Sequence, residues 1–433
     1  MRIATAVMIT LIVILALAAS ASARTWYIRP DGSGDAPTIQ AGIDSSAAGD
    51  TVLVACGIYY EHDIAMKSGI CLRSETGDAS CAVVDGQAIG RVFYCDGVDN
   101  TSAIEDLTIA NGFASDPDIN GGGMYCINSS LRIVACAFEN NVSDGGGGAM
   151  FCHTSPVHIE GCVFTRNTAG NSGAGPGGAV SCPYSSAEIV DCRFVDNSCK
   201  SNGGALDFSC CSPSINNCVF IGNTADVGGG VSSYGCDSSP FITGCLFKGN
   251  SAVTWGGGLA CFGSTFPEVI DCIFVSNSTD GEGGGLFFGW SSPVVRNCTI
   301  SGNSAGDGGG GIGLRDARYT IDNSIIAFST SGEAISCLMD NPGRLTCCDI
   351  YGNAGGDWVE CIYFQYGQNG DFSADPKFCD RRSGNFMLCE NSPCVPGNHP
   401  QGADCSLIGA FGVGCGPTAV EYTTWGRIKS MFR

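Results

Sequence analysis

Residues 218–230 read CVFIGNTADVGGG, and the same order of residue types returns throughout the middle of the chain. Each copy has a cysteine, a phenylalanine two positions later, an asparagine three positions after that, and then a cluster of glycines. Successive copies start 26 to 30 residues apart. A fixed period of this length is the signature of stacked structural repeats. The complete copies supply Cys136, Phe138 and Asn141; Cys162, Phe164 and Asn167; Cys192, Phe194 and Asn197; Cys218, Phe220 and Asn223; Cys245, Phe247 and Asn250; and Cys272, Phe274 and Asn277.

The repeats predict short strands rather than helices. A glycine cluster such as 228–230 would cost a helix about 1 kcal/mol per glycine. Between the clusters, apolar and polar residues alternate over short runs, as in SPFITGCLF at 239–247, and this period is typical of strands. One repeat cannot bury its own apolar face, but stacked repeats can. We therefore predict an all-β fold, a parallel β-helix of about a dozen coils whose strands pair with their equivalents in neighbouring coils.

Each recurring residue type of the repeat has an expected place in such a coil. The phenylalanines form a stacked column inside, and the cysteines face the same interior as small apolar side chains. The asparagines are expected in left-handed backbone at one corner, with their amides in a ladder of hydrogen bonds. The glycine cluster is expected at a second corner, where a positive φ or a close backbone approach leaves no room for Cβ.

The 28 cysteines leave two interpretations open. A second column comprises Cys126, Cys152, Cys182, Cys210 or Cys211, Cys236 and Cys261. These cysteines either form bridges within or between coils, or they are buried thiols. The column that begins at Cys136 is expected to be mostly reduced, because stacked side chains that point the same way have poor disulfide geometry. Disulfides are expected in the loop-rich closing segment, at Cys379, Cys389, Cys394, Cys405 and Cys415.

The repeat resembles known β-helix proteins. The Phe-x-x-Asn spacing of Phe220 and Asn223, together with the glycine pairs, resembles the repeats of polymorphic outer-membrane proteins and of the right-handed, pectin-lyase-like β-helix family that includes pectate lyases. The resemblance covers roughly residues 90–355 and implies a right-handed solenoid. The segment 24–95, with a short helix over 37–48 whose Ile39, Ile43 and Ala47 share one face, resembles the N-terminal cap of these proteins.

The chain divides into five predicted parts. These are a signal peptide at 1–23, an N-terminal cap with the first coils at 24–95, the β-helix repeats at 96–374, a cysteine-rich closing coil at 375–416 and a tail at 417–433. The apolar run before Ala21-Ser22-Ala23 predicts cleavage and a secreted or cell-surface protein without a transmembrane segment. A net charge of −21 argues against nucleic acid as a partner. We expect a monomer.

The pectate-lyase resemblance implies carboxylates that hold Ca²⁺ and an arginine or lysine that abstracts a proton, and the sequence contains no matching motif. Asp280, Glu282 and Asp307 near the glycine corner are weak Ca²⁺ candidates, and solvated surface acids are the favoured alternative. No cofactor is required. Aromatic residues recur near the same corner and form either an outward sugar-binding stripe or, as we favour, part of the core. They are Tyr184, Tyr234, Trp255, Phe262, Phe288 and Trp290.

The favoured function is therefore a non-catalytic binding or structural role outside the cell, with polysaccharide or a cell-surface glycan as the candidate partner. The alternative is a pectate-lyase-like polysaccharide lyase or hydrolase. Three or more carboxylates and an arginine that converge in one lateral groove would favour the enzyme.

Overall fold

The computed structural model describes residues 23–415, apart from 116–118, 172 and 340–341. In this part of the chain, four parallel sheets run side by side along a solenoid of about twelve coils, and each coil contributes one short strand to most of the sheets. The predicted all-β parallel solenoid is confirmed. The expected signal peptide at 1–23 lies outside the described residues, apart from residue 23. The tail at 417–433 also lies outside them.

Sheet A contains β1 (Thr25–Ile28), β2 (Thr51–Val54), β5 (Cys71–Ser74), β8 (Ala103–Glu105), β12 (Arg132–Val134), β16 (His158–Glu160), β20 (Glu188–Val190), β24 (Ser214–Asn216), β28 (Phe241–Thr243), β32 (Glu268–Ile270), β36 (Val294–Arg296), β40 (Thr320–Asp322) and β43 (Arg344–Thr346). Sheet B contains β3 (Gly57–Tyr59), β6 (Ala82–Asp85), β9 (Thr108–Ala110), β13 (Ala137–Glu139), β17 (Val163–Thr165), β21 (Arg193–Val195), β25 (Val219–Ile221), β29 (Leu246–Lys248), β33 (Ile273–Val275), β37 (Thr299–Ser301), β41 (Ile325–Ala327) and β44 (Asp349–Tyr351).

Sheet C contains β4 (Ile64–Ala65), β7 (Phe93–Asp96), β11 (Met124–Ile127), β15 (Met150–His153), β19 (Val180–Pro183), β23 (Leu206–Ser209), β27 (Val231–Tyr234), β31 (Leu259–Phe262), β35 (Leu286–Gly289), β39 (Ile312–Arg315) and β42 (Ile335–Leu338). Sheet D contains β10 (Phe113–Ala114), β14 (Val142–Ser143), β18 (Thr168–Ala169), β22 (Ser198–Cys199), β26 (Thr224–Val227), β30 (Ser251–Trp255), β34 (Ser278–Thr279) and β38 (Ser304–Ala305).

The repeated phenylalanines and cysteines form columns in the interior. The rings of Phe138, Phe164, Phe194, Phe220, Phe247 and Phe274 stack with centroids 4.5–5.0 Å apart, and all six are fully buried. The cysteines of the first column, Cys136, Cys162, Cys192, Cys218, Cys245 and Cys272, are buried free thiols. Backbone N–H groups of this column donate to the sulfur one coil further on, as from Cys218 to Cys245 at 3.4 Å.

The asparagines form a continuous amide ladder from Asn141 through Asn167, Asn197, Asn223, Asn250 and Asn277 to Asn303. In each step Nδ2 donates to Oδ1 of the next asparagine at 2.9–3.0 Å. The expectation that asparagine itself takes left-handed backbone is wrong. The positive φ falls on the preceding residue, such as Asp196 or Gly222, so that each asparagine side chain turns inward to the ladder.

The glycine cluster makes a tight corner of each coil. Gly203 has φ +72°, and a Cβ placed there would lie 2.0 Å from the carbonyl oxygen of Leu206. A side chain at this position would therefore collide with the backbone of the same corner.

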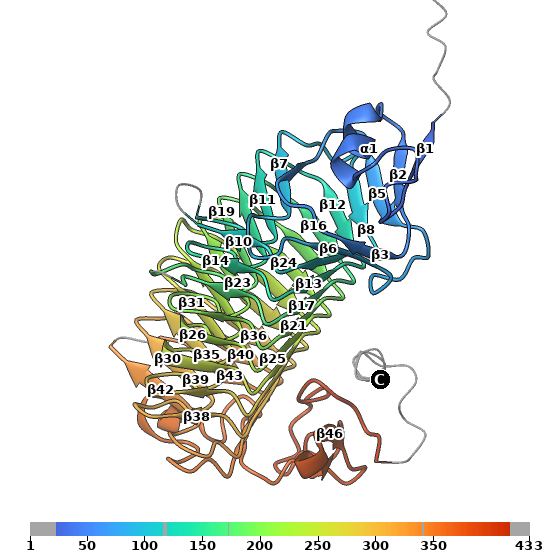
Figure 1. Ribbon diagram of the computed structural model, residues 1–433. Helices are drawn as coiled ribbons and strands as arrows, with labels where there is room; N and C mark the ends of the chain where they lie inside the picture. The colour runs from blue at the N-terminus through green and yellow to red at the C-terminus, as the bar shows by residue number, and fades with distance from the viewer. Residues whose placement is uncertain (1–22, 116–118, 172, 340–341, 416–433) are drawn as a thin grey trace, which may run out of the picture.

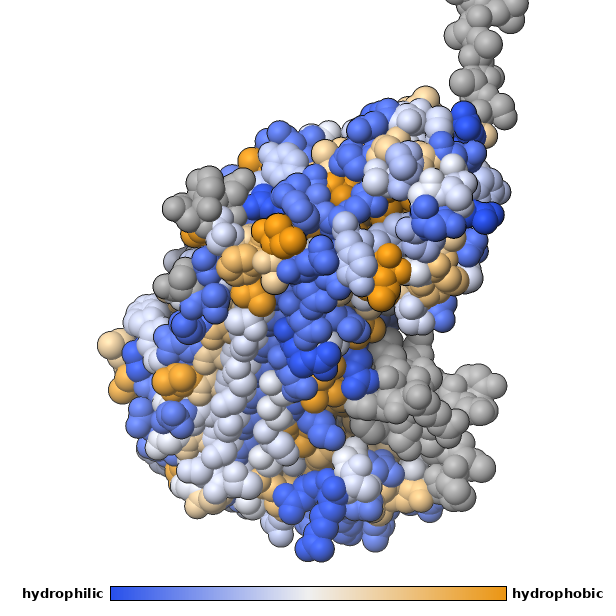
Figure 2. All heavy atoms as spheres, viewed as in Figure 1, coloured by the Kyte–Doolittle hydropathy of each residue, from blue (hydrophilic) through white to orange (hydrophobic). Residues whose placement is uncertain are grey.

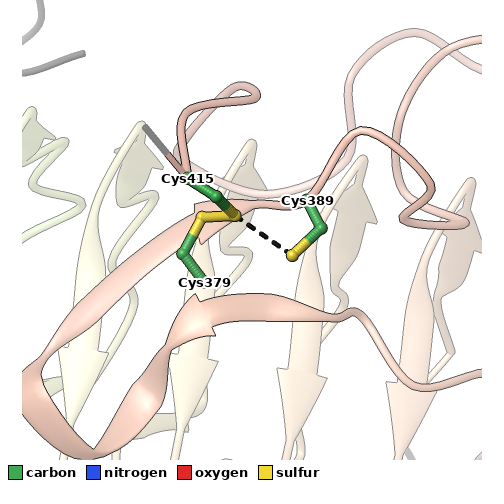
Figure 3. Close-up of side chains that lie close together, drawn as sticks. All are labelled: Cys379, Cys389 and Cys415. Carbon is green, nitrogen blue, oxygen red and sulfur yellow. Dashed lines mark hydrogen bonds between the residues drawn. A yellow bond between two sulfur atoms is a disulfide. The ribbon is translucent and has the colours of Figure 1, made fainter. Parts of the chain in front are cut away.

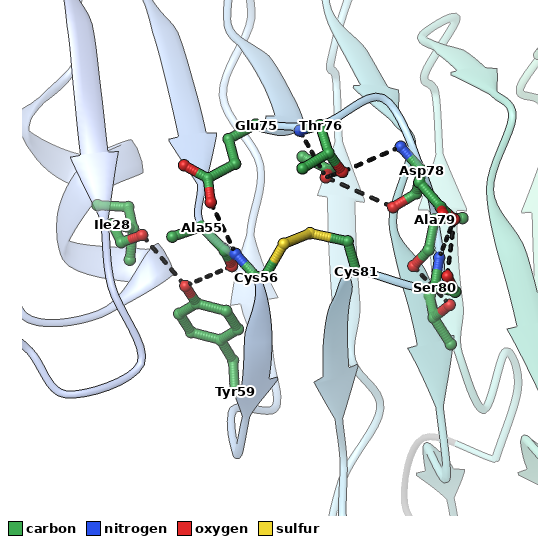
Figure 4. The surroundings of a disulfide bond; sticks show 12 residues. Ile28, Ala55, Cys56, Tyr59, Glu75, Thr76, Asp78, Ala79, Ser80 and Cys81 are labelled. Carbon is green, nitrogen blue, oxygen red and sulfur yellow. Dashed lines mark hydrogen bonds between the residues drawn. A yellow bond between two sulfur atoms is a disulfide. The ribbon is translucent and has the colours of Figure 1, made fainter.

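The N-terminal end is covered by α1 (Ile39–Ser45), which begins after the N-cap Thr38 and buries Ile39 and Ile43. Ala47 was expected on the same face, but it follows the end of the helix and is exposed. A disulfide between Cys56 and Cys81 joins the first two coils (Figure 4). Beside it the buried hydroxyl of Tyr59 donates to Ile28 O or Ala55 O at 3.1 and 2.9 Å, and burial raises the pKa of Tyr59 to about 12.

The other end is closed by the 3₁₀ helix η1 (Glu360–Gln365), which buries Ile362 against the last coil. Residues 375–415, which we call the C-terminal segment, lie along the side of the solenoid (Figure 1). Within it are β45 (Phe378–Asp380), the 3₁₀ helix η2 (Arg381–Ser383) and β46 (Asn385–Leu388). Its side chains Phe386, Met387 and Phe411 pack on an apolar strip of sheet B formed by Val219, Leu246 and Ile273.

The predicted disulfide cysteines of this segment divide into two groups. Cys379 is bonded to Cys415, and Cys405 is bonded to Cys347. Cys389 and Cys394 are free thiols. Disulfides also join Cys210 to Cys236 and Cys337 to Cys361. Within the second column, Cys126, Cys152, Cys182 and Cys261 are buried and free.

Candidate functional site

The outer face of sheet C carries side chains from alternate positions of each strand. The last residues of β27, β31, β35 and β39 are in register and place Tyr234, Phe262, Gly289 and Arg315 in one file. The rings of Tyr234 and Phe262 stack with their centroids 5.4 Å apart. Gly289 has no side chain, and the ring of Phe287 fills this place: a Cβ on Gly289 would lie 2.9 Å from Phe287 Cε1.

Trp255 joins this file from the neighbouring sheet. It lies at the end of β30, where the pairing with β26 shifts register. Its ring stacks on Phe287 with centroids 5.0 Å apart, and it meets Phe262 and Trp290 edge-on at 5.9 and 6.5 Å. The result is an aromatic cluster where sheets C and D meet.

Arg315 and Glu282 form an ion pair within this cluster. Nη2 of Arg315 donates to Oε1 of Glu282 at 2.5 Å, and their side chains are 21% and 14% exposed. The guanidinium carbon lies 5.2 Å from the ring centre of Trp255 and 5.9 Å from that of Trp290, within reach of a cation–π interaction. Glu282 Oε2 and Arg315 Nε are buried and have no hydrogen-bond partner within the described structure.

Two hollows in the surface border the cluster. The first, the acidic pocket, has a volume of about 340 Å³ and is lined by Val253, Thr254, Trp255, Asp280, Gly281, Glu282, Asp307 and Arg315. The second, the Trp290 hollow, has about 430 Å³ and is lined by Asp237, Ser264, Thr265, Phe266, Trp290, Ser291, Ser292, Asp316, Ala317, Arg318 and Pro342. Trp290 and Phe266 are 39% and 47% exposed, so both aromatic side chains are accessible from the second hollow.

The three Ca²⁺ candidates Asp280, Glu282 and Asp307 all line the acidic pocket. Calcium takes six to eight oxygen ligands, so it needs carboxylates that converge closely. Among the described residues, the cluster whose metal-ligating atoms all meet within 4.8 Å comprises Cys379, Cys389 and Cys415, and Glu282 is turned toward Arg315. The calcium site stays a prediction.

The aromatic residues named from the sequence are divided between the surface and the interior. Phe288 is fully buried in the core. Tyr234, Phe262, Trp255 and Trp290 belong to the outer cluster, and Tyr184 is 60% exposed further along the same side. The preference for a core role was therefore wrong for most of them. Sequence reasoning missed Arg315, whose signal is its place at the end of a strand equivalent to those ending in Tyr234 and Phe262.

Residues 41–292 match the family model described as right-handed beta helix region, and this match covers more than half of the chain. The chain belongs to this family of right-handed β-helix proteins. A search of curated proteins finds no match. Among the described residues, no helix is long and apolar enough to cross a membrane.

Several solved structures are similar. A family PL6 alginate lyase is 12% identical with a TM-score of 0.42, and the match covers 87% of this chain and 57% of that chain. A rhamnogalacturonan lyase is 14% identical with a TM-score of 0.38, covering 93% and 99%. The catalytic unit of an α-1,3-glucanase from Streptomyces thermodiastaticus is 13% identical with a TM-score of 0.35, covering 78% and 64%. This chain therefore spans less than two thirds of the lengths of the alginate lyase and the glucanase.

Proposed function

We propose that this protein binds polysaccharide outside the cell, at the acidic pocket and the Trp290 hollow, and does not cleave it. Sugar rings present apolar C–H faces and a rim of hydroxyl groups. Sites that bind them therefore combine flat aromatic side chains with hydrogen-bonding groups. The two hollows offer Trp255 and Trp290 next to Asp280, Glu282 and Arg315.

The unsatisfied polar atoms of the ion pair carry this proposal. A buried polar group without a hydrogen bond costs about 1–3 kcal/mol. Glu282 Oε2 and Arg315 Nε are such atoms, and they belong to residues that line the acidic pocket beside an indole ring. These atoms are enclosed, so a small movement of the two side chains must turn them toward the pocket. A sugar hydroxyl both donates and accepts, so it can then donate to the carboxylate and accept from the guanidinium.

An enzyme is the second candidate, because three carboxylates and one arginine line a single lateral pocket. A lyase of this kind needs a base to remove a proton from the sugar. The guanidinium of Arg315 is paired with Glu282, and an arginine remains protonated in proteins. This pairing favours binding over proton abstraction.

The oxidised cysteines support the location outside the cell. Disulfides persist in oxidising compartments, and five are present among the described residues.

Figure 2 shows one face of the molecule as mainly hydrophilic and near-neutral residues, with hydrophobic residues in separate small groups. We propose that the protein acts outside the cell as a monomer.

The test is binding of the purified full chain to a panel of neutral and uronate polysaccharides, with and without Ca²⁺, together with an assay for new ultraviolet absorbance from unsaturated products. We expect binding without product. Trp290→Ala should weaken it about tenfold, since a lost aromatic contact is worth on the order of 1.5 kcal/mol.

Tyr184→Ala is the matched control, because it removes an exposed aromatic side chain away from both hollows. It should leave affinity unchanged. Product formation that Arg315→Lys abolishes would establish the enzyme instead. Binding that Trp290→Ala leaves intact would place the ligand elsewhere.

A further inference from the structure

Three cysteine sulfurs meet at one edge of the C-terminal segment (Figure 3). Cys379 in β45 is bonded to Cys415, and the sulfur of Cys389, just after β46, lies 3.0 Å from the sulfur of Cys415. Each of the three sulfur atoms lies within 4.8 Å of the other two. Cys415 is exposed, and Cys379 and Cys389 are half-buried. In Figure 3 the side chain of Cys389 points at the disulfide on the side of Cys415.

Backbone hydrogen bonds hold the three cysteines together independently of the disulfide. β46 lies between β45 and the strand-like residues before Cys415. On one side, Cys389 N donates to Lys377 O at 3.0 Å. On the other, Leu388 N donates to Gly412 O at 3.0 Å and Gly414 N donates to Leu388 O at 3.1 Å. The backbone geometry therefore keeps Cys415 next to Cys389 and Cys379 whichever of them it is bonded to.

This environment differs from that of the other free cysteines. The thiols of the first cysteine column are buried and lie against backbone groups and other thiols of the core. Cys394 in the same segment is buried and donates to Asp349 Oδ2 at 3.2 Å. Thiol–disulfide exchange requires an accessible thiol that can reach a disulfide sulfur. Among the free cysteines that the structure describes, Cys389 combines partial exposure with contact to a disulfide.

We propose that Cys379, Cys389 and Cys415 form a thiol–disulfide exchange site in which Cys415 alternates between two partners. The thiolate of Cys389 attacks Sγ of Cys415, a Cys389–Cys415 bond forms, and the Cys379–Cys415 bond breaks. Cys379 leaves as a thiolate and takes up the proton that Cys389 lost. One disulfide and one thiol are present before and after, so no oxidant or reductant is consumed.

The exchange presents a different thiol in each state. With Cys379 bonded, the half-exposed thiol of Cys389 is open to low-molecular-weight disulfides and electrophiles. With Cys389 bonded, the thiol belongs to Cys379, which packs beside the apolar contact between this segment and sheet B. Residue 415 is thus tied either to β45 or to the end of β46.

Peptide mapping of the full chain distinguishes the two states. The protein is incubated at pH 8, trapped with excess N-ethylmaleimide, and digested with trypsin without reduction. Cleavage after Lys377 and Arg381 isolates Phe378–Arg381, while Cys389 and Cys415 remain in one peptide that begins at Ser383. The short peptide is disulfide-linked in one state and is released with an alkylated Cys379 in the other.

We expect both forms, in a ratio within about tenfold of unity, because the two bonds join similar thiols without a change in redox state. Trapping with N-ethylmaleimide before incubation should preserve the starting ratio. Cys389→Ser should leave the short peptide fully linked, and Cys394→Ser, which removes a thiol that does not contact the disulfide, should leave the wild-type ratio. A short peptide that stays fully linked in the wild type, with all Cys389 alkylated, would overturn the proposal.

Cys379→Ser provides a second readout. Here Cys415 should pair with Cys389, and neither should react with N-ethylmaleimide. A free Cys415 in this variant would also overturn the proposal. If the variant does not accumulate as folded protein, the wild-type ratio alone decides.

Discussion

The first cysteine column of the coils and the C-terminal segment use cysteine in different ways. In the coils, the cysteines of the first column stack as free thiols, although each lies directly above the next. In the C-terminal segment, Cys379 forms a disulfide with Cys415 of the same segment, and Cys405 forms one with Cys347 of the solenoid. Stacked cysteines are bonded elsewhere in the coils, because Cys56 and Cys81 stand at equivalent places of two neighbouring parallel coils and form a disulfide. Proximity in a stack therefore does not by itself decide how a cysteine is used. In the first column each thiol instead accepts a hydrogen bond from the N–H of the cysteine one coil before.

The two regions also obtain their stability differently. A coil satisfies its buried polar groups through copies of itself, as in the asparagine ladder. The C-terminal segment has no repeat to pair with, so disulfides and single contacts fix it to the solenoid. Perturbing one contact of each kind tests this comparison.

The largest expected effect comes from the asparagine ladder. Asn223→Ala removes an amide that donates to Asn250 Oδ1 and Phe194 O and accepts from Asn197 N and Nδ2. Buried groups left without partners cost about 1–3 kcal/mol each, so we expect the free energy of unfolding to fall by roughly 4 kcal/mol. Urea denaturation measures the loss. Asn171→Ala, at an exposed asparagine, should change it by less than about 0.5 kcal/mol. Equal effects at the two sites would show that the ladder contributes little.

A smaller effect is expected from pH at the junction with the C-terminal segment. Burial raises the pKa of Asp349 to about 7, and its oxygens accept from Ala374 N and Cys394 Sγ. The folded state therefore keeps a proton that the unfolded chain releases above its ordinary pKa near 4. The stability present below about pH 4 is lost as the pH rises toward 7, by about 2–4 kcal/mol, and then levels off.

Urea denaturation from pH 4 to pH 8 measures this loss. Asp349→Asn should flatten the fall in stability, and Asp404→Asn, at an exposed aspartate of the same segment, should leave it unchanged. Burial also raises the pKa of Asp371 to about 7, so part of the slope should remain in Asp349→Asn. An identical slope in wild type and Asp349→Asn would contradict the assignment.

The smallest effect is expected in the thiol column. Cys245 accepts from Cys218 N and donates to Thr243 O. Ser324 makes the equivalent contacts one coil beyond Cys298, accepting from Cys298 N and donating to Asp322 O. Cys245→Ser should therefore cost less than about 1 kcal/mol, whereas Cys245→Ala, which orphans the N–H of Cys218, should cost about 1–2 kcal/mol. A serine more damaging than alanine in urea denaturation would show that the column tolerates only sulfur.

The repeat allowed the solenoid to be predicted because one period specifies every coil. The place of the C-terminal segment was missed, although a signal was present. Val219, Leu246 and Ile273 are apolar at an outward position where Arg193 stands one coil earlier, and such a strip requires a cover.

The ion pair between Glu282 and Arg315 was not predicted from the sequence. They lie 33 residues apart across the corner where coil lengths vary, so the period does not bring them into register.

The asparagine ladder has a consequence for the evolution of this chain. Every inner rung makes the same contacts with the rung before and the rung after it. Duplicating or deleting one whole coil therefore recreates the junction it interrupts and leaves both ends as they were. The length of the molecule can change in increments of one strand spacing, about 4.8 Å, while a gain or loss of a partial coil would misalign every column at once.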